Sequence, residues 1–291
     1  MAEFAPTRTR DEHGWLEYPR DKPLRAGMFP EGLLEQIMTH PAKQQAYLHM
    51  DVVSYVSKPG DTVLDPFGGV GTTLISAAMG RNVVLVEIEQ YYYDIIQQCV
   101  DYLEWCREHG KSPLEGYSIG NMLVLNADNR VVMPIPCDHV ITSPPYGNDL
   151  YSGADSAVSK SGKSTRKLST GGDVGLATQN AAEMQQYGQA TQNIGKLPKF
   201  TYQQVMKQVY EKIVRSVRVG GTITVTHRDR IEAGERVLYV ESIVGTLVKL
   251  GCGVKLLDKW KTPRTIQANV NRNLGVDVVE DEDVIIMERL R

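Results

Sequence analysis

Short apolar runs alternate with segments of helical periodicity along most of this chain. Glycine, proline or charged residues bound these runs, as is typical of strands. The predicted strands lie at 62–67, 82–89, 122–128, 139–142, 222–227, 254–260 and 283–290. The run at 82–89, NVVLVEIE, is almost continuously apolar, which is typical of a parallel strand buried on both faces.

Apolar side chains recur at three- and four-residue intervals between most of these strands and predict helices. The first predicted helix follows His40 and ends at Pro59-Gly60, and the residues before His40 form a polar lead-in. Further helices are predicted at 72–80, 95–103, 205–217 and 240–250. We expect the helix over 205–217 to end at Gly220-Gly221.

Strands that alternate with helices predict an α/β fold with a mainly parallel, seven-stranded sheet and helices on both faces. Ligands of such sheets bind beyond the carboxyl ends of the strands. Along the chain we expect an amino-terminal lead-in and cofactor-binding half at 1–147, a polar insertion at 148–200, and the remainder of the same domain at 201–291.

The insertion at 148–200 breaks the alternating pattern because it is rich in Gly, Ser, Thr, Asn and Gln. A polar segment of this length inside a compact domain is usually either disordered or functional. Its basic side chains include Lys160, Lys163, Arg166 and Lys167. Both interpretations stay open, and the functional one makes the insertion a candidate target-recognition region.

The amino-acid composition excludes few classes of protein. The chain has 291 residues and a formal net charge of −3, which argues against a uniformly basic nucleic-acid binder but not against a local basic groove. Its four cysteines form no C-x-x-C pair, so neither a metal site nor a disulfide framework is indicated. No signal peptide or bilayer-spanning run stands out, so we expect a cytoplasmic protein without membrane contact.

The sequence LDPFGGVGTT at 64–73 places three glycines between a predicted strand and a predicted helix. Glycine lets the backbone turn sharply and approach a ligand closely. A P-loop needs G-x-x-x-x-G-K-[ST], which is absent, and a dinucleotide loop needs a glycine where Leu74 stands. The third interpretation is a site for S-adenosylmethionine (AdoMet), in which the loop wraps the amino-acid part of the cofactor.

Acidic residues at the ends of two successive strands favour the AdoMet interpretation. Glu87 lies near the end of its strand, where a carboxylate can accept hydrogen bonds from both ribose hydroxyls; Glu89 is a rival for this role. Asp128 ends the next strand, where it can receive the adenine amino group. A glycine loop followed by these acids indicates a nucleoside cofactor more strongly than the loop alone.

The sequence VITSPPY at 140–146 ends a strand with two prolines and an aromatic residue. Proline has no backbone N–H and cannot continue a central ladder, so the strand stops at Ser143. A rigid Pro-Pro-Tyr loop therefore lies at the same sheet edge as the glycine loop.

Together these motifs resemble those of the AdoMet-dependent DNA amino-methyltransferases, which methylate N4 of cytosine or N6 of adenine. The resemblance rests on the sequences HPAK (40–43), GDTVLDPFGGVGTT (60–73), VEIEQYY (86–92) and TSPPY (142–146). It extends more loosely over 196–229. It implies a Rossmann-like AdoMet methyltransferase fold and S-adenosyl-L-methionine as the cofactor.

The resemblance also implies roles for individual residues. The catalytic loop would consist of Ser143, Pro144, Pro145 and Tyr146. The cofactor would be contacted by Lys43, Asp65, Phe67, Gly68, Gly69, Gly71, Thr72, Thr73, Glu87 and Asp128. Among these, the segment around Lys43 would lie near the methionine carboxylate.

An exocyclic amino nitrogen is a weak nucleophile because its lone pair is delocalised into the base. The Ser143 side chain and the Pro144 carbonyl can accept hydrogen bonds from this amino group, and Tyr146 can stack on a base flipped out of the duplex. Serine at the first loop position is typical of the cytosine-N4 enzymes of the family, whereas Asp is typical of the adenine enzymes. Cytosine-C5 methylation needs a cysteine nucleophile in the loop, and Cys137 precedes the strand instead of following it.

Basic residues at two places are candidates for DNA contact. Phosphate contacts fix the register of a protein on DNA, and a few polar side chains read base edges. The candidates are Lys160, Lys163, Arg166 and Lys167 in the insertion and His227, Arg228 and Arg230 after the strand at 222–227. The polar segment at 261–273 is a second candidate for target contact.

The sequence thus predicts a DNA cytosine-N4 methyltransferase of a restriction-modification or counter-defence system, with DNA as substrate and a restriction enzyme as a candidate partner. Three alternatives stay open: an adenine-N6 DNA methyltransferase, an RNA amino-methyltransferase, and a catalytically silent AdoMet-fold protein that binds nucleic acid. The intact SPPY loop and Glu87 argue against the silent protein.

Overall fold

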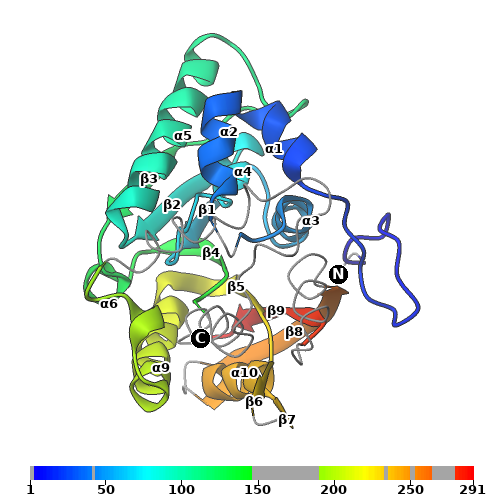
Figure 1. Cartoon of the computed structure of the whole chain (residues 1–291), viewed down its shortest axis with the longest axis vertical. Coiled ribbons are helices and arrows are strands. Elements are labelled where there is room, and N and C mark those ends of the chain that lie inside the picture. Colours follow the sequence, from blue (N-terminus) through cyan, green and yellow to red (C-terminus); the bar gives the residue numbers. More distant parts are fainter. Residues whose placement is uncertain (1–2, 41–42, 146–189, 233–234, 250–252, 264–278) are drawn as a thin grey trace, which may run out of the picture.

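The seven-stranded sheet expected from the sequence forms the centre of the computed structural model, which describes residues 3–40, 43–145, 190–232, 235–249, 253–263 and 279–291 (Figure 1). The strands follow the order β3-β2-β1-β4-β5-β9-β8. Their bounds are Thr62–Asp65 (β1), Asn82–Glu87 (β2), Met122–Asn126 (β3), Cys137–Thr142 (β4), Val217–His227 (β5), Val254–Pro263 (β8) and Asp281–Arg289 (β9). Neighbouring strands from β3 to β5 are parallel, whereas β9 is antiparallel to both β5 and β8. The predicted fold class is confirmed.

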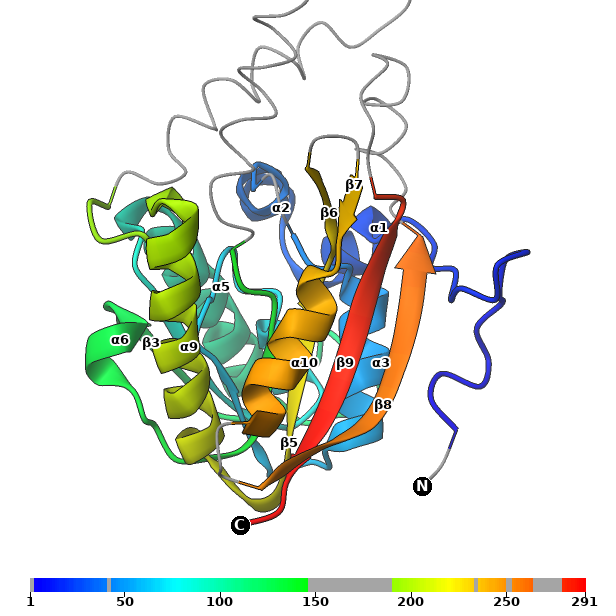
Figure 2. The same ribbon diagram turned by 90° about the horizontal axis from the view of Figure 1, so that it is seen from below.

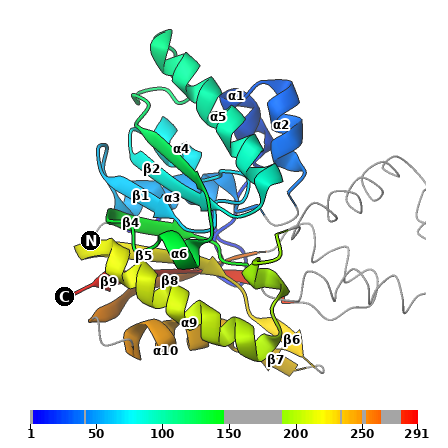
Figure 3. The ribbon, with the colours of Figure 1, turned by 90° about the vertical axis from the view of Figure 1, so that its left-hand side faces the viewer.

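Helices cover both faces of the sheet (Figure 3). One face carries α1 (Lys22–Met28), α2 (Glu31–Met38), α3 (Ala46–Val56), α4 (Leu74–Ala78) and α5 (Gln90–Glu108). The other carries α6 (Asn129–Val132), α9 (Lys199–Ser216) and α10 (Tyr239–Lys249). A short 3₁₀ helix, η2 (Ile194–Lys196), precedes α9, and a hairpin of β6 (Arg230–Glu232) and β7 (Glu235–Val237) follows β5.

Alternating strand residues divide the interior into two apolar cores. Val63 and Leu85 pack in the core beneath α1 to α5, whereas Leu64 and Val86 pack in the core beneath α9 and α10. This division follows from the two-residue period of a strand, in which successive side chains point to opposite faces. It explains why the central strands β1 and β2 are apolar almost throughout.

The polar lead-in expected before His40 is wrong as a description of this region. Residues 22–38 form α1 and α2, and Phe4, Leu16 and Met28 are buried in the first core. The Phe4 ring stacks on Trp260 of β8 with 4.1 Å between ring centroids. Helix α2 has an apolar stripe of its own, with Leu33, Leu34 and Ile37 buried, whereas Phe4, Leu16 and Met28 are isolated along the chain.

The expected helix end at Gly220-Gly221 is also corrected by the structure. Helix α9 ends at Ser216, and both glycines lie within β5. Strand pairing shifts here, since β4 pairs Cys137 with Val217 but His139 with Thr222. A Cβ atom on Gly221 would lie 2.1 Å from the Asp138 carbonyl oxygen, so the irregular strand needs glycine for close approach and not for helix termination.

Strands β1 and β4 are sequence-distant neighbours, and the chain order reverses between them. This topological switch point is where ligands bind in open α/β sheets. The carboxyl ends of β1, β2 and β4 carry Asp65, Glu87 and Thr142. Among the described residues, no helix is both long enough and apolar enough to cross a bilayer.

Replacing Phe4 by Ala should lower the free energy of unfolding by about 3 kcal/mol, because it removes a fully buried aromatic ring. Phe200 is 73% exposed, so Phe200→Ala should change the free energy of unfolding by less than about 0.5 kcal/mol. Urea unfolding of both variants checks this pair. Equal stabilities would contradict the packing of the amino-terminal segment on β8.

Candidate cofactor and catalytic site

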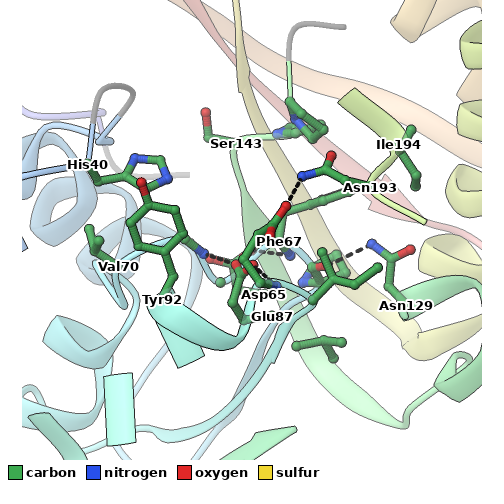
Figure 4. Close-up of a pocket in the computed structure, with 18 of the residues that line it drawn as sticks. His40, Asp65, Phe67, Val70, Glu87, Tyr92, Asn129, Ser143, Asn193 and Ile194 are labelled. Carbon is green, nitrogen blue, oxygen red and sulfur yellow. Dashed lines mark hydrogen bonds between the residues drawn. The ribbon is translucent and has the colours of Figure 1, made fainter. Parts of the chain in front are cut away.

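A pocket lies at the switch point between β1 and β4 and encloses about 940 Å³, including the part open to solvent. Figure 4 shows His40, Val70 and Tyr92 on one side of it and Asn129, Asn193 and Ile194 on the other. Its position at the switch point of the sheet makes it the candidate ligand site.

The glycine loop between β1 and α4 forms the floor of the pocket. Gly69 and Gly71 have φ angles of +55° and +76°, which disfavour any side chain. Gly68 donates its N–H to the Val86 carbonyl at 2.9 Å, and a Cβ atom there would lie 3.3 Å from Ile96 Cδ1. The loop therefore packs against the end of β2, and the pocket lies on its other side.

Asp65, the last residue of β1, binds three different parts of the site. Its carboxylate accepts hydrogen bonds from Phe67 N at 3.0 Å, Thr73 Oγ1 at 2.7 Å and Thr142 Oγ1 at 2.7 Å. Burial raises the pKa of Asp65 to about 6, although these donors lower it. The contact with Thr142 joins the glycine loop directly to the residue before Ser143.

Glu87 at the end of β2 accepts hydrogen bonds from Gly69 N at 2.7 Å and Glu89 N at 2.8 Å. Burial raises its pKa to about 7, against the effect of the two backbone donors. A carboxylate that holds the glycine loop is in place to contact whatever that loop binds. Glu87 also lines the pocket, and its ribose contact stays a prediction.

Glu89, the rival for this role, also lines the pocket but has a different set of partners. It accepts hydrogen bonds from Asn193 Nδ2 at 2.5 Å and Ala190 N at 2.8 Å. The side chain is only 3% exposed. Glu89 therefore binds the segment that leads into α9, and Glu87 is the carboxylate that faces the glycine loop.

Asp128 and Asn129 lie at the far end of the pocket, where α6 begins. Asp128 caps this helix through Arg130 N and forms an ion pair with the Arg130 guanidinium at 2.5 Å. Burial raises the pKa of Asp128, but its hydrogen bonds with Arg130 outweigh that effect and lower it. Asn129 donates to the Pro66 carbonyl at 2.8 Å, while its buried Oδ1 accepts no hydrogen bond from the described residues. Asn129 is thus a second acceptor at this end, which the motifs did not indicate.

The opposite end of the pocket is cationic. Lys43 Nζ donates to the carbonyls of His40 at 2.7 Å and Met38 at 3.0 Å, so it closes the end of α2. Burial, followed by the charges of Lys43 and Arg25, lowers the pKa of His40 to about 3. His40 is therefore neutral and packs edge-on against Tyr92 with 4.6 Å between centroids.

Arg25 of α1 lies behind this cationic end and is only 2% exposed. Its Nε forms an ion pair with Asp21 at 2.8 Å, and its Nη2 donates to Gln44 O at 2.8 Å and Thr72 Oγ1 at 3.3 Å. Since Thr72 Oγ1 accepts this bond, its own proton is directed elsewhere, and Thr72 lines the pocket. No motif marks Arg25, because it lies 47 residues from its partner Thr72.

The candidate catalytic loop begins where β4 ends at Thr142. Ser143, Pro144 and Pro145 all line the pocket, and Tyr202 Oη donates to the Pro145 carbonyl at 2.5 Å. Tyr146 lies outside the described residues. The described part of the loop thus lines the same pocket as most residues expected to contact the cofactor.

Most of the expected cofactor residues line the pocket together. They are Lys43, Asp65, Phe67, Gly68, Gly69, Thr72, Glu87 and Asp128. Gly71 and Thr73 do not line it: Gly71 packs against Leu74 and Ile96, and Thr73 donates to Asp65. Among the described residues, no group of three or more His, Cys, Asp or Glu side chains is arranged to hold a metal ion.

The structure describes only some of the residues expected to contact DNA. Lys160, Lys163, Arg166 and Lys167 lie outside the described residues. His227 is 2% exposed and packs against Tyr239 with 5.0 Å between ring centroids, which argues against direct DNA contact by this side chain. Arg228 follows β5 and Arg230 begins β6, and Figure 2 shows the hairpin of β6 and β7 leading into α10.

Two comparisons of the sequence with known proteins match this chain to DNA methyltransferases. Residues 13–98 match the family model described as DNA methylase. Over 60 residues the chain is 42% identical to the Type II methyltransferase M.HinfI of Haemophilus influenzae, a match that covers 20% of this chain and 17% of that protein. The match thus spans less than a fifth of that relative's length. Both matches bear out the resemblance to the DNA amino-methyltransferase family that the motifs predicted.

The chain also aligns with solved structures at low sequence identity. TrmN from Thermus thermophilus has a TM-score of 0.44 and 14% identity, over 87% of this chain and 52% of that one. A methyltransferase from Pyrococcus furiosus has a TM-score of 0.44 and 10% identity, over 85% of this chain and 84% of that one.

Arg25→Met should lower the free energy of unfolding by roughly 3 kcal/mol, because it leaves the Asp21 carboxylate and two acceptors without their buried cation. Arg218 forms an ion pair with Asp138 at 2.5 Å but is 51% exposed. Arg218→Met is therefore the matched control and should cost less than about 1 kcal/mol. Equal losses in denaturant unfolding would contradict the role of Arg25.

Proposed function

Taking the match to the DNA methylase family as the premise, we propose that this protein transfers a methyl group from AdoMet to the exocyclic N4 of a cytosine in DNA. One contact carries the proposal: the hydrogen bond of 2.7 Å between Thr142 Oγ1 and Asp65. It joins the start of the glycine loop to the residue just before the Ser143-Pro144-Pro145 loop, and both loops line a single pocket. Methyl transfer needs these two parts side by side because alignment of donor and acceptor supplies much of the rate.

The charges along the pocket support AdoMet as the cofactor. AdoMet carries a carboxylate at one end, a sulfonium and an ammonium near it, and an adenine at the other end. Thr72, backed by Arg25, would receive the carboxylate, and Asp65 and Glu87 would balance the positive charges and bind the ribose hydroxyls. The free Oδ1 of Asn129 would accept from the adenine amino group beside Asp128. When bound, AdoMet supplies a methyl group made electrophilic by its sulfonium.

The residues of the catalytic loop would act on the target amino group as acceptors. The Ser143 hydroxyl and the Pro144 carbonyl would take hydrogen bonds from the N–H₂ group, which favours a tetrahedral nitrogen with a free lone pair. The fixed φ angles of Pro144 and Pro145 hold these acceptors in place at little entropic cost. Tyr146 would stack on the flipped base, an interaction worth about 1–3 kcal/mol.

The surroundings of Cys137 argue against cytosine-C5 chemistry. This residue begins β4, whereas Ser143 follows the other end of the strand. Burial raises the pKa of the Cys137 thiol to about 12, so it is not a ready nucleophile. We therefore propose transfer without a covalent enzyme intermediate.

Cytosine N4 is favoured over adenine N6 by Ser143 at the first loop position, where the adenine enzymes of the resembled family typically have Asp. An RNA substrate and a silent binding module are the remaining alternatives. A restriction enzyme stays a proposed partner, and the insertion at 148–200 a proposed target-recognition region.

Incubation with AdoMet labelled in its methyl group and mixed-sequence DNA, followed by nucleoside analysis, should give N4-methylcytosine. Ser143→Ala should lower the transfer rate by roughly 10- to 100-fold and leave AdoMet affinity unchanged, because the serine contacts only the target in this proposal. Detection of N6-methyladenine would show that the target is adenine N6 and not cytosine N4. Label on RNA alone would select the RNA enzyme, and no label on either nucleic acid would contradict methyl transfer.

AdoMet affinity should fall roughly tenfold as the pH is lowered from 8 to 5.5. The pKa values of Asp65 and Glu87 are raised by burial to about 6 and about 7, so both groups lose their negative charge as the pH falls through this window. Isothermal titration calorimetry checks this expectation. S-adenosylhomocysteine lacks the sulfonium charge and should show a smaller change; an AdoMet affinity independent of pH would contradict the assigned charge balance.

A further inference from the structure

The segment from Ala190 to Tyr202 contacts both Glu89, which follows β2, and the candidate catalytic loop at Pro145. Ala190 N and Asn193 Nδ2 donate to Glu89 at the end of β2. Further along, a Cβ atom on Gly195 would lie 3.5 Å from Pro145 Cβ, and Tyr202 Oη donates to the Pro145 carbonyl. No cofactor or catalytic role was expected for any of these residues from the motifs.

We propose that Tyr202 is a positioning residue for methyl transfer, whose phenol holds the Pro145 carbonyl and so fixes the direction of the Ser143 and Pro144 acceptors. This inference rests on the proposed function. Tyr202 itself is not a catalytic residue, because it acts on the target only through the loop.

The geometry of the contact supports a specific role. Tyr202 lies in the first turn of α9, is 2% exposed, and its oxygen is 2.5 Å from the Pro145 oxygen. A hydrogen bond of this length is strong, and the burial of Tyr202 shields its hydroxyl from competing water, while Pro145 is partly exposed. The backbone of Tyr202 is itself held by a bond of 2.8 Å to the Pro198 carbonyl.

Two anchors therefore enclose the three described residues of the loop. Thr142 is tied to Asp65 on the upstream side, and Pro145 is tied to Tyr202 on the downstream side. Between them, the proline rings remove most of the remaining backbone freedom. The phenol occupies one lone pair of the Pro145 carbonyl, which leaves the Pro144 carbonyl and the Ser143 hydroxyl as the acceptors for a target amino group.

The same helix contains a matched tyrosine without this contact. Tyr210 is 3% exposed and packs in the second core, and its hydroxyl makes no hydrogen bond with the described residues. Removing the hydroxyl of Tyr210 should therefore leave the loop unchanged. Comparing Tyr202→Phe with Tyr210→Phe therefore separates the effect of one hydrogen bond from the general effect of altering a buried tyrosine in α9.

The test compares Tyr202→Phe and Tyr210→Phe with the wild-type chain in single-turnover methylation of mixed-sequence DNA. Tyr202→Phe should lower the methyl-transfer rate constant roughly tenfold, because a small misplacement of reacting groups is costly, and should leave AdoMet affinity within twofold of wild type. Tyr210→Phe should match wild type in both quantities. The phenyl ring retains the packing of the phenol, and circular dichroism checks that both variants are folded.

A wild-type rate constant for Tyr202→Phe would overturn the inference while the proposed function stands. Equal losses of rate and AdoMet affinity would also overturn it, since they indicate a general structural role. A wild-type chain that labels neither DNA nor RNA would overturn the proposed function and this inference with it.

Discussion

The arrangement of the site depends on one buried carboxylate. Asp65 receives hydrogen bonds from the glycine loop, from Thr73 just before α4 and from Thr142 at the end of β4. A buried carboxylate is stable only when its oxygens are well hydrogen-bonded, so the three donors and Asp65 require one another. The carboxylate thereby fixes the distance between the floor of the pocket and the proline loop. The proposed transfer from cofactor to target depends on this distance between the glycine loop and the proline loop.

Local chemistry explains which parts of the site the sequence could predict. The glycine loop and the Ser143-Pro144-Pro145 loop were predictable because glycine and proline act on the backbone of their own turn, whatever surrounds them. The central strands β1 and β2 were predictable because they are buried on both faces, which leaves a nearly continuous apolar run. Gly220-Gly221 shows the limit of local rules: the same pair that commonly ends a helix here permits two strands to approach closely.

The residues that were missed act through distant partners. Arg25 lies in a short helix with no apolar stripe, and it becomes part of the site only because Thr72 and Gln44 fold against it. Asn193 contacts Glu89 across 104 residues of sequence, and Tyr202 contacts Pro145 across 57. The spacing of residues along the sequence therefore gives no indication that such pairs are in contact. The lead-in and the last residues of the insertion were therefore described by composition, although both supply side chains near or in the pocket.

The position of the pocket between two cores has a consequence for the whole molecule. Val70 belongs to the apolar core on one face of the sheet, and Val86 and Ile194 belong to the core on the other, yet all three line the same cavity. A bound cofactor would therefore complete the packing of both cores at once. Because a ligand that binds only the folded state adds its binding free energy to folding, it would strengthen the cohesion between the two layers. In this protein the cofactor would then serve as an internal structural component as well as a reagent.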